Sequence, residues 1–125
     1  MRYLCLIYQD ESLWETMPKT EADGIDNDYF AFTDAITKSG QYISGNPLQP
    51  TRTATTVRVR NGRISISDGP FMETREQLGG YFLVEARDLD DALRLASGIP
   101  GVRRGSVEVR PIMEVGEPRA ANDPR

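Results

Sequence analysis

The sequence of 125 residues contains no histidine. Histidine is the side chain used most often for proton transfer near neutral pH, and it is also a common zinc ligand. Its absence excludes histidine acid–base catalysis, Ser–His and Cys–His nucleophile pairs, and histidine-ligated metals. The carboxylates also lack the spacing of a calcium-binding loop. We therefore expect no metal site and no bound cofactor.

The sequence has only one cysteine. It also lacks an excess of basic residues and has no long apolar run. The single cysteine, Cys5, excludes an intramolecular disulfide and lies in an apolar segment, so we expect a buried, unreactive thiol. The net charge of −4 and the pI of about 4.8 argue against direct binding to nucleic acid or to an acidic membrane surface. No apolar run approaches the roughly 18 residues of a membrane span, and no signal peptide is recognisable. These features predict one globular domain in the cytoplasm.

Two segments are apolar on both sides of an extended chain, which is typical of strands covered on both faces. They span residues 2–9 and residues 80–86. In the first of them Tyr3, Cys5 and Ile7 occupy one face, whereas the other face carries Leu4, Leu6 and Tyr8. Both segments are therefore predicted to lie at the centre of a sheet.

Helical periodicity marks two further segments. Residues 24–39 are predicted to form a helix that ends at Gly40, and residues 10–23 are predicted to form a loop with at most a short helical turn. Asp88 is a suitable N-cap for a second helix over residues 89–98. The expected inner faces are Ile25, Tyr29, Phe32 and Ile36 for the first helix and Leu89, Ala92, Leu93 and Ala96 for the second.

The remaining strands are predicted from alternation. Residues 55–60 and 63–67 flank Asn61-Gly62, a strong hairpin signal, and Val57 and Val59 are expected to point inward. Residues 105–113 alternate as a last strand. Residues 41–53, which contain a glycine and two prolines, are expected to be irregular apart from a short extended piece at Tyr42-Ile43. The tail, residues 116–125, is expected to be disordered and to lie outside a domain of residues 1–115.

The predicted order is strand, helix, hairpin, strand, helix, strand. It matches an α+β fold with a ferredoxin-like βαββαβ unit and an added hairpin. Two helices cover only one face of such a sheet, while the other face still carries leucine and tyrosine. A second copy of the chain is the simplest cover, so we predict a homodimer.

Special backbone and ionisable side chains follow the hairpin at Asp68, Gly69, Pro70, Phe71 and Glu73. An acid, a glycine and a proline in a row fix a tight turn, and this combination favours a binding site. Asp68 is either a catalytic acid or base with a pKa raised by burial, or an acceptor that ties down the turn. Gly69 and Pro70 shape the backbone on either interpretation. Phe71 either lines a pocket or fills the core, and Glu73 is either a second carboxylate near Asp68 or a solvated charge.

A second group of candidate residues is expected on the open face of the sheet if the valines point toward the helices. Its members are Tyr8, Arg58, Tyr81, Glu85, Glu108 and Arg110. They form either cross-strand ion pairs or a polar cleft for a small anionic or carboxylate ligand, with arginine as the fork and tyrosine as a stacking surface. Trp14 and Met17 in the first loop either form a flap over a cleft or pack on the sheet edge. Trp14 should be at least half buried in both cases.

Several motifs occur in the order found in the DGPF family of the YCII-related superfamily, which this sequence resembles over residues 1–115. The stretches that carry the resemblance are Tyr3–Tyr8, Thr53–Arg58, Ser67–Tyr81 with its Asp68-Gly69-Pro70-Phe71, Glu85–Ala92, Ile99-Pro100 and Gly105–Pro111. The resemblance implies a dimeric α+β barrel, in which two ferredoxin-like sheets face one another and clefts form beside the shared interior.

The resemblance implies less about function. Some YCII-related proteins act on halogenated or lactone-type aromatic breakdown products through a His–Asp pair. That mechanism does not carry over to a chain without histidine, even where Asp68 matches the acidic position. Genes of DGPF members often lie beside genes for extracytoplasmic-function sigma factors, an association that says nothing about chemistry.

The sequence therefore supports two main hypotheses. The first is a homodimer that binds a small molecule in a cleft near Asp68, with lyase or isomerase chemistry by Asp68 if the protein is an enzyme. The alternative is a non-catalytic regulatory or partner-binding module linked to an extracytoplasmic-function sigma-factor system, favoured by the lack of histidine and reactive cysteine. A third reading is a structural dimer whose site has decayed.

Overall fold

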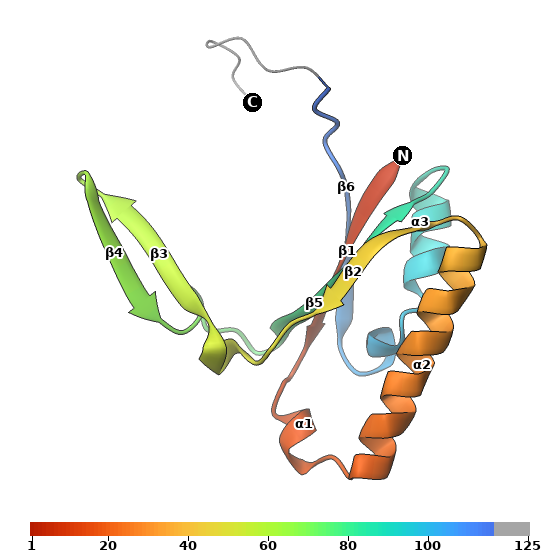
Figure 1. Ribbon diagram of the computed structural model, residues 1–125, viewed down its shortest axis with the longest axis horizontal. Helices are drawn as coiled ribbons and strands as arrows, with labels where there is room; N and C mark the ends of the chain where they lie inside the picture. The colour runs from red at the N-terminus through yellow and green to blue at the C-terminus, as the bar shows by residue number, and fades with distance from the viewer. Residues whose placement is uncertain (117–125) are drawn as a thin grey trace.

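A computed structural model describes residues 1–116 of the chain, and the predicted disordered tail lies, apart from Gly116, outside the described residues. Four antiparallel strands form the main sheet in the order β2-β5-β1-β6. Their bounds are Arg2–Gln9 for β1, Tyr42–Pro47 for β2, Gln77–Glu85 for β5 and Ser106–Pro111 for β6. Helices α2 (Lys19–Lys38) and α3 (Leu89–Ala96) lie on one side of this sheet (Figure 1).

This arrangement confirms the predicted α+β class. Helix α2 connects β1 to β2, helix α3 connects β5 to β6, and the resulting strand order is consistent with a ferredoxin-like fold. The two strands that were apolar on both faces, β1 and β5, are the central strands, as predicted. No helix among residues 1–116 has the length and apolar character needed to cross a bilayer.

The core lies between the sheet and the two helices. Alternate residues of β1 and β5 point into it, and they meet apolar side chains from α2, α3 and the segment after α3. The buried apolar residues include Tyr3, Cys5, Ile7, Ile36, Phe82, Val84, Ala92, Leu95, Ala96 and Ile99. On the opposite, open face of the sheet, Leu4, Leu6, Tyr8 and Leu83 remain partly exposed.

The first predicted helix is longer than its apolar pattern indicated. Helix α2 begins at Lys19 rather than at residue 24, directly after Pro18, whose extended backbone precedes the first turn. Lys19 and Asp23 form an ion pair of 2.8 Å in that turn. Periodicity alone missed this turn because its residues, apart from the half-buried Ala22, are polar and exposed, whereas the apolar face begins at Ile25. The predicted short helical turn in the loop is α1, Leu13–Thr16.

The second strand of the sheet is also longer than predicted. Strand β2 runs from Tyr42 to Pro47, although residues 41–53 were expected to be mostly irregular. It is an edge strand, so the proline at its end removes no hydrogen bond from a central ladder. A short 3-10 helix, η1 (Thr51–Thr53), follows it, and another, η2 (Pro100–Arg103), precedes β6.

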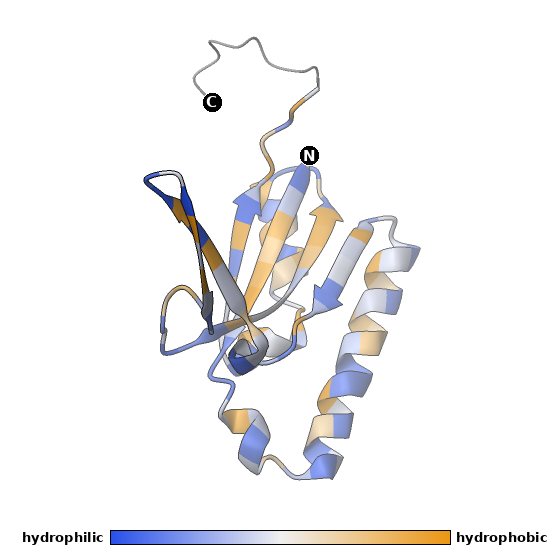
Figure 2. Cartoon of the chain, turned by 60° about the vertical axis from the view of Figure 1, so that its left-hand side comes forward, coloured by the Kyte–Doolittle hydropathy of each residue, from blue (hydrophilic) through white to orange (hydrophobic). Residues whose placement is uncertain are grey.

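The predicted hairpin forms, but it does not join the main sheet. Strands β3 (Thr55–Arg60) and β4 (Arg63–Asp68) pair only with each other, and their turn has positive φ at Asn61 and Gly62 (52° and 73°). The expectation that Val57 and Val59 point into the core is wrong, because they are 64% and 58% exposed. The hairpin leaves the body on the side away from the helices (Figure 1), and apolar and polar residues alternate along it (Figure 2).

The inner face of the second helix is rotated from the predicted one. Helix α3 buries Ala92, Leu95 and Ala96, whereas Leu89 and Leu93 are exposed. The predicted N-cap is confirmed, since the Asp88 carboxylate accepts a hydrogen bond of 2.9 Å from the Asp91 N–H. The helix ends at Ala96, two residues earlier than predicted, because Ile99 turns into the core.

Cys5 is completely buried, and loss of contact with water raises the pKa of its thiol to about 11 from the ordinary 9.0. The unfolded chain loses this proton first as the pH rises. The free energy of unfolding should therefore fall by up to about 1.4 kcal/mol per pH unit between these two values. Urea unfolding from pH 8 to 11 tests this, and a Cys5→Ala variant should lack that part of the slope. Parallel pH profiles for the two proteins would contradict the assignment.

Candidate functional site

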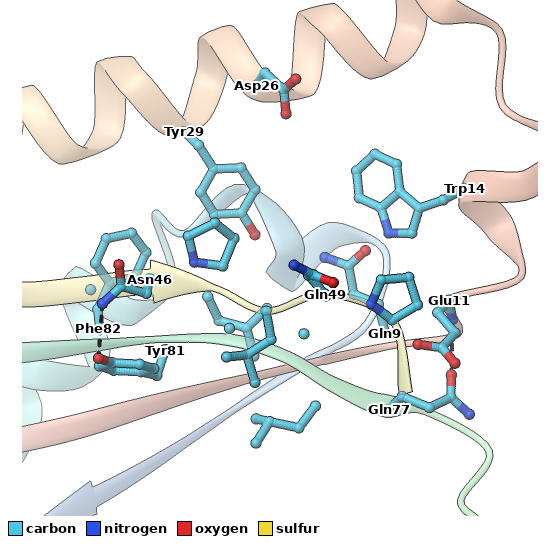
Figure 3. Close-up of a pocket in the computed structure, with 18 of the residues that line it drawn as sticks. Gln9, Glu11, Trp14, Asp26, Tyr29, Asn46, Gln49, Gln77, Tyr81 and Phe82 are labelled. Carbon is cyan, nitrogen blue, oxygen red and sulfur yellow. Dashed lines mark hydrogen bonds between the residues drawn. The ribbon is translucent and has the colours of Figure 1, made fainter. Parts of the chain in front are cut away.

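A cleft of about 680 Å³ opens between helix α2 and the end of the main sheet (Figure 3). Five parts of the chain meet there: the end of β1, the segment around α1, the middle of α2, the stretch from β2 to η1, and the start of β5. Its walls include Gln9, Glu11, Trp14, Glu15, Asp26, Tyr29, Phe30, Tyr42, Asn46, Leu48, Gln49, Arg52, Gln77, Tyr81 and Phe82.

Aromatic rings form the wall toward the core. Phe82 is buried, and the rings of Tyr29 and Tyr42 lie around it with centroid distances of 6.5 and 6.4 Å. Phe32 packs edge-on against the same ring at 5.3 Å. This cluster fixes the orientation of Tyr29, and Trp14 lies across the cleft from it (Figure 3).

The hydroxyl of Tyr29 is held by backbone from η2. It accepts a hydrogen bond of 3.0 Å from the Gly101 N–H. Burial raises the pKa of this tyrosine, and the Gly101 hydrogen bond and Arg104 only partly oppose that shift. The ring is therefore a neutral, fixed wall of the cleft at physiological pH.

The floor is tied together by hydrogen bonds between distant segments. The Glu11 carboxylate accepts hydrogen bonds from the N–H and the hydroxyl of Thr51 in η1, the first at 3.1 Å. The Glu11 N–H donates to the Gln77 side chain at 2.9 Å, and the Gln77 amide donates to the Thr74 carbonyl at 2.6 Å. These bonds join the α1 segment to η1 and β5, so this side of the cleft is organised without a ligand.

Several other polar groups of the cleft have no partner within residues 1–116. The side chains of Glu15, Asp26 and Arg52 make no ion pair or hydrogen bond there, and the side-chain amides of Gln9 and Gln49 make no hydrogen bond. Asn46 donates to the Tyr81 hydroxyl at 3.0 Å. No cysteine, serine or lysine lines the cleft. The arrangement is suited to recognition by aromatic and polar contacts.

The predicted site around Asp68 lies elsewhere. Asp68 is exposed at the end of β4, pairs with Thr55 in the hairpin ladder, and lines no cavity described among residues 1–116. The backbone of Gly69 ties the hairpin base, donating to the Ala54 carbonyl and accepting from the Thr56 hydroxyl, both at 2.8 Å. Phe71 is 68% exposed, so it does not fill the core, and it is not among the residues that line the cleft or the smaller cavity.

A smaller cavity of about 290 Å³ lies beside the main cleft. It is lined by Pro70 and Glu73 from the predicted site, together with Thr51, Arg52, Met72, Thr74 and Gln77. Arg52 and Gln77 border both cavities. The turn segment after the hairpin therefore reaches the edge of the cleft region through Pro70 and Glu73, not through Asp68.

The second predicted group is brought together only in part. Tyr8, Glu108 and Arg110 lie on the open face of the sheet, and Arg110 pairs with Glu108 at 3.1 Å along the same strand. Glu85 binds the N-terminal ammonium group at 2.7 Å. The prediction that Arg58 lies on the open face is wrong, because Arg58 is part of the hairpin, which does not join the main sheet. Tyr81 and Glu85 also lie on the open face, opposite Leu6 and Arg2 of β1, and Tyr81 borders the cleft as well.

Trp14, which was weighed as a flap residue, lines the cleft and is 40% exposed, within the predicted limit. Met17 is partly buried and does not line it. Among residues 1–116 no group of three or more acidic, cysteine or histidine side chains is placed to hold a metal ion.

Comparison with known proteins identifies the family over all of the described residues. Residues 1–116 match the model of the YCII-related domain. The chain belongs to the YCII-related family. One relative, an uncharacterised protein of Rhizobium meliloti (strain 1021), is 36% identical over 114 residues, which cover 90% of this chain and 92% of the relative. The YCII-related domain thus includes the cleft, the smaller cavity and the hairpin.

Most cleft residues of this YCII-related chain were missed by sequence reasoning. Asp26 and Tyr29 lie one turn apart on α2, where their spacing looks like an ordinary helix surface next to a core position. Gln49 lies between two prolines in a segment expected to be irregular. The usable signal was the run Pro47–Pro50, because loops positioned by a rigid framework often carry binding residues.

Proposed function

We propose that this YCII-related protein binds a small molecule with an aromatic or other flat apolar part in the cleft beside α2. The observation that carries the proposal is the set of unpartnered polar side chains converging on an aromatic wall. The cleft volume of about 680 Å³ lies in the range of small-molecule sites. The polar side chains without a partner can orient a bound molecule by hydrogen bonds, and the rings around Phe82 offer an apolar surface for it to contact.

Binding is better supported than chemistry at Asp68. A general acid or base has to lie within hydrogen-bond reach of the proton it transfers. Asp68 is exposed on the hairpin and lines neither cavity. Lyase or isomerase chemistry through Asp68 would therefore require a second copy of the chain to place this carboxylate against a bound molecule.

We also propose that the protein acts as a homodimer. Leu4, Leu6 and Leu83 leave the open face of the sheet partly apolar, and the hairpin carries a second apolar surface, formed by Val57, Val59, Ile64 and Ile66. An isolated two-stranded hairpin is at best marginally stable in water. A second copy seated between the sheet face and the hairpin would cover both surfaces (Figure 1).

The cleft proposal is tested by NMR with ¹⁵N-labelled protein and a set of small aromatic compounds of positive, neutral and negative charge. We expect compounds that bind to shift the Trp14 indole N–H and the side-chain amides of Gln9, Asn46 and Gln49. Amides of the hairpin, such as Val59, serve as the internal control and should stay unchanged. Shifts confined to the hairpin or the open sheet face would overturn the proposal.

A second candidate function is that of a non-catalytic partner-binding module, including one that serves an extracytoplasmic-function sigma-factor system. The exposed apolar residues of the hairpin favour it, because contiguous exposed apolar patches often mark protein interfaces. The two candidates differ in what covers the hairpin. A second copy leaves a dimer in purified protein, whereas a different partner leaves a monomer.

A further inference from the structure

We propose that the ligand of the cleft carries a positively charged amine, held beside Asp26 and Glu15 and against the rings of Trp14 and Tyr29. This inference rests on the proposed binding function and names the chemical class of the ligand. It differs from the anionic ligand expected from the sequence, because the cleft lies beside α2 and not on the open sheet face where the arginines were placed.

The charges of the cleft favour a cation. Glu11, Glu15 and Asp26 line it against the single guanidinium of Arg52, which leaves an excess of negative charge. Glu11 is already satisfied by Thr51. Glu15 and Asp26 have no partner among residues 1–116, so both carboxylates are available to a ligand. An anion placed in the same cleft would be repelled by both carboxylates.

Aromatic faces provide the second element of an amine site. A cation gains energy over the face of tryptophan, and to a lesser degree over that of tyrosine. Asp26 points from α2 toward the space between the rings of Tyr29 and Trp14 (Figure 3). A carboxylate and two rings around one space can bind an ammonium group by charge and by its interaction with the rings.

Other residues that line the cleft are suited to the rest of such a molecule. Ile7, Leu48 and Phe82 provide apolar contacts, while the unpartnered amides of Gln9 and Gln49 can bind a hydroxyl or carbonyl group. A ligand with a charged amine at one end and a flat apolar body at the other satisfies both regions. An arylalkylamine is the simplest compound of this class.

The test uses three probes of similar shape and different charge: phenethylamine, 2-phenylethanol and phenylacetate. Trp14 is the only tryptophan of the chain and lines the cleft, so its fluorescence reports binding directly. At low ionic strength and pH 7 we expect phenethylamine to bind about tenfold more tightly than phenylacetate, with the alcohol in between. Added salt should weaken phenethylamine binding and leave the alcohol unchanged.

Two variants test whether the preference for phenethylamine depends on the carboxylate of Asp26. Asp26→Asn should weaken phenethylamine binding about two- to fivefold and leave 2-phenylethanol unaffected. Asp28→Asn is the matched control, because Asp28 is exposed on the same helix and does not line the cleft. Circular dichroism verifies that both variants fold.

The outcomes separate this inference from the binding function. If 2-phenylethanol or phenylacetate binds as tightly as phenethylamine, or if Asp26→Asn and Asp28→Asn behave alike, the amine assignment is wrong and the cleft remains a binding site. If none of the probes changes Trp14 fluorescence at millimolar concentration, both the amine assignment and the proposed cleft function are overturned.

Discussion

Replacing Gly105 by alanine is expected to lower the free energy of unfolding by about 3 kcal/mol or more. A Cβ atom at this position would lie 2.0 Å from the carbonyl oxygen of Tyr8 and 3.0 Å from Cγ of Gln9. The first contact is with backbone of a central strand, which cannot move aside without breaking its pairing with β6. Gly105 is therefore required for the close approach of the turn after η2 to β1.

The matched control is Gly24→Ala in helix α2, where an added Cβ has no atom within 4 Å. That variant should be more stable than the parent by about 0.5–1 kcal/mol, because glycine is costly within a helix. Urea unfolding monitored by circular dichroism measures both values. A Gly105→Ala protein as stable as the parent would show that the turn and β1 are farther apart than described.

Replacing both Val59 and Ile64 by aspartate is expected to convert the proposed dimer into a monomer. The two residues oppose one another across the hairpin on its apolar face. Placing carboxylates there would bury charge without a partner in the dimer, a cost of about 1–3 kcal/mol or more for each group. Light scattering after size-exclusion chromatography measures the mass of both proteins. The parent should have twice the chain mass of 14.0 kDa, and the double variant should have 14.0 kDa.

The control for this experiment is the double variant Ser65→Asp, Ser67→Asp. These serines lie on the opposite, polar face of the same hairpin, across from Arg58 and Thr56. The control adds the same charge and should remain dimeric. A parent protein that is monomeric at micromolar concentration would remove the dimer proposal and favour a different partner for the hairpin. Equal masses for both double variants would show that the apolar face is not the contact.

Local chemistry predicted the elements of this fold better than their placement. Residues 2–9 were correctly assigned to a central strand because both of their faces are apolar. Asn61-Gly62 correctly marked a turn because few other pairs adopt two successive positive φ angles. Alternation at Val57 and Val59 correctly showed that they share a face. It did not reveal what covers that face, since this depends on where the whole hairpin is directed.

The candidate site was harder to predict for a related reason. Asp68, Gly69 and Pro70 are prominent in the sequence because they shape the backbone, and the structure uses them at the base of the hairpin. The cleft instead assembles residues from five separate segments. Asp26 and Gln49 carry no local signal of a shared site, because only the packing of α2 against the sheet brings them together. Trp14 was identified because a tryptophan in a polar loop requires contact area.

The two connections of the hairpin to the body both pass through the wall of the cleft. The chain leaves through η1, where Thr51 binds Glu11, and returns through Gln77, which binds the backbone of the same glutamate. A second copy that shifts the hairpin on docking would therefore also shift the cleft floor. Ligand binding and subunit association then become linked equilibria. If the ligand raises the association constant of the dimer by a given factor, the dimer binds the ligand with an affinity that is higher by the same factor.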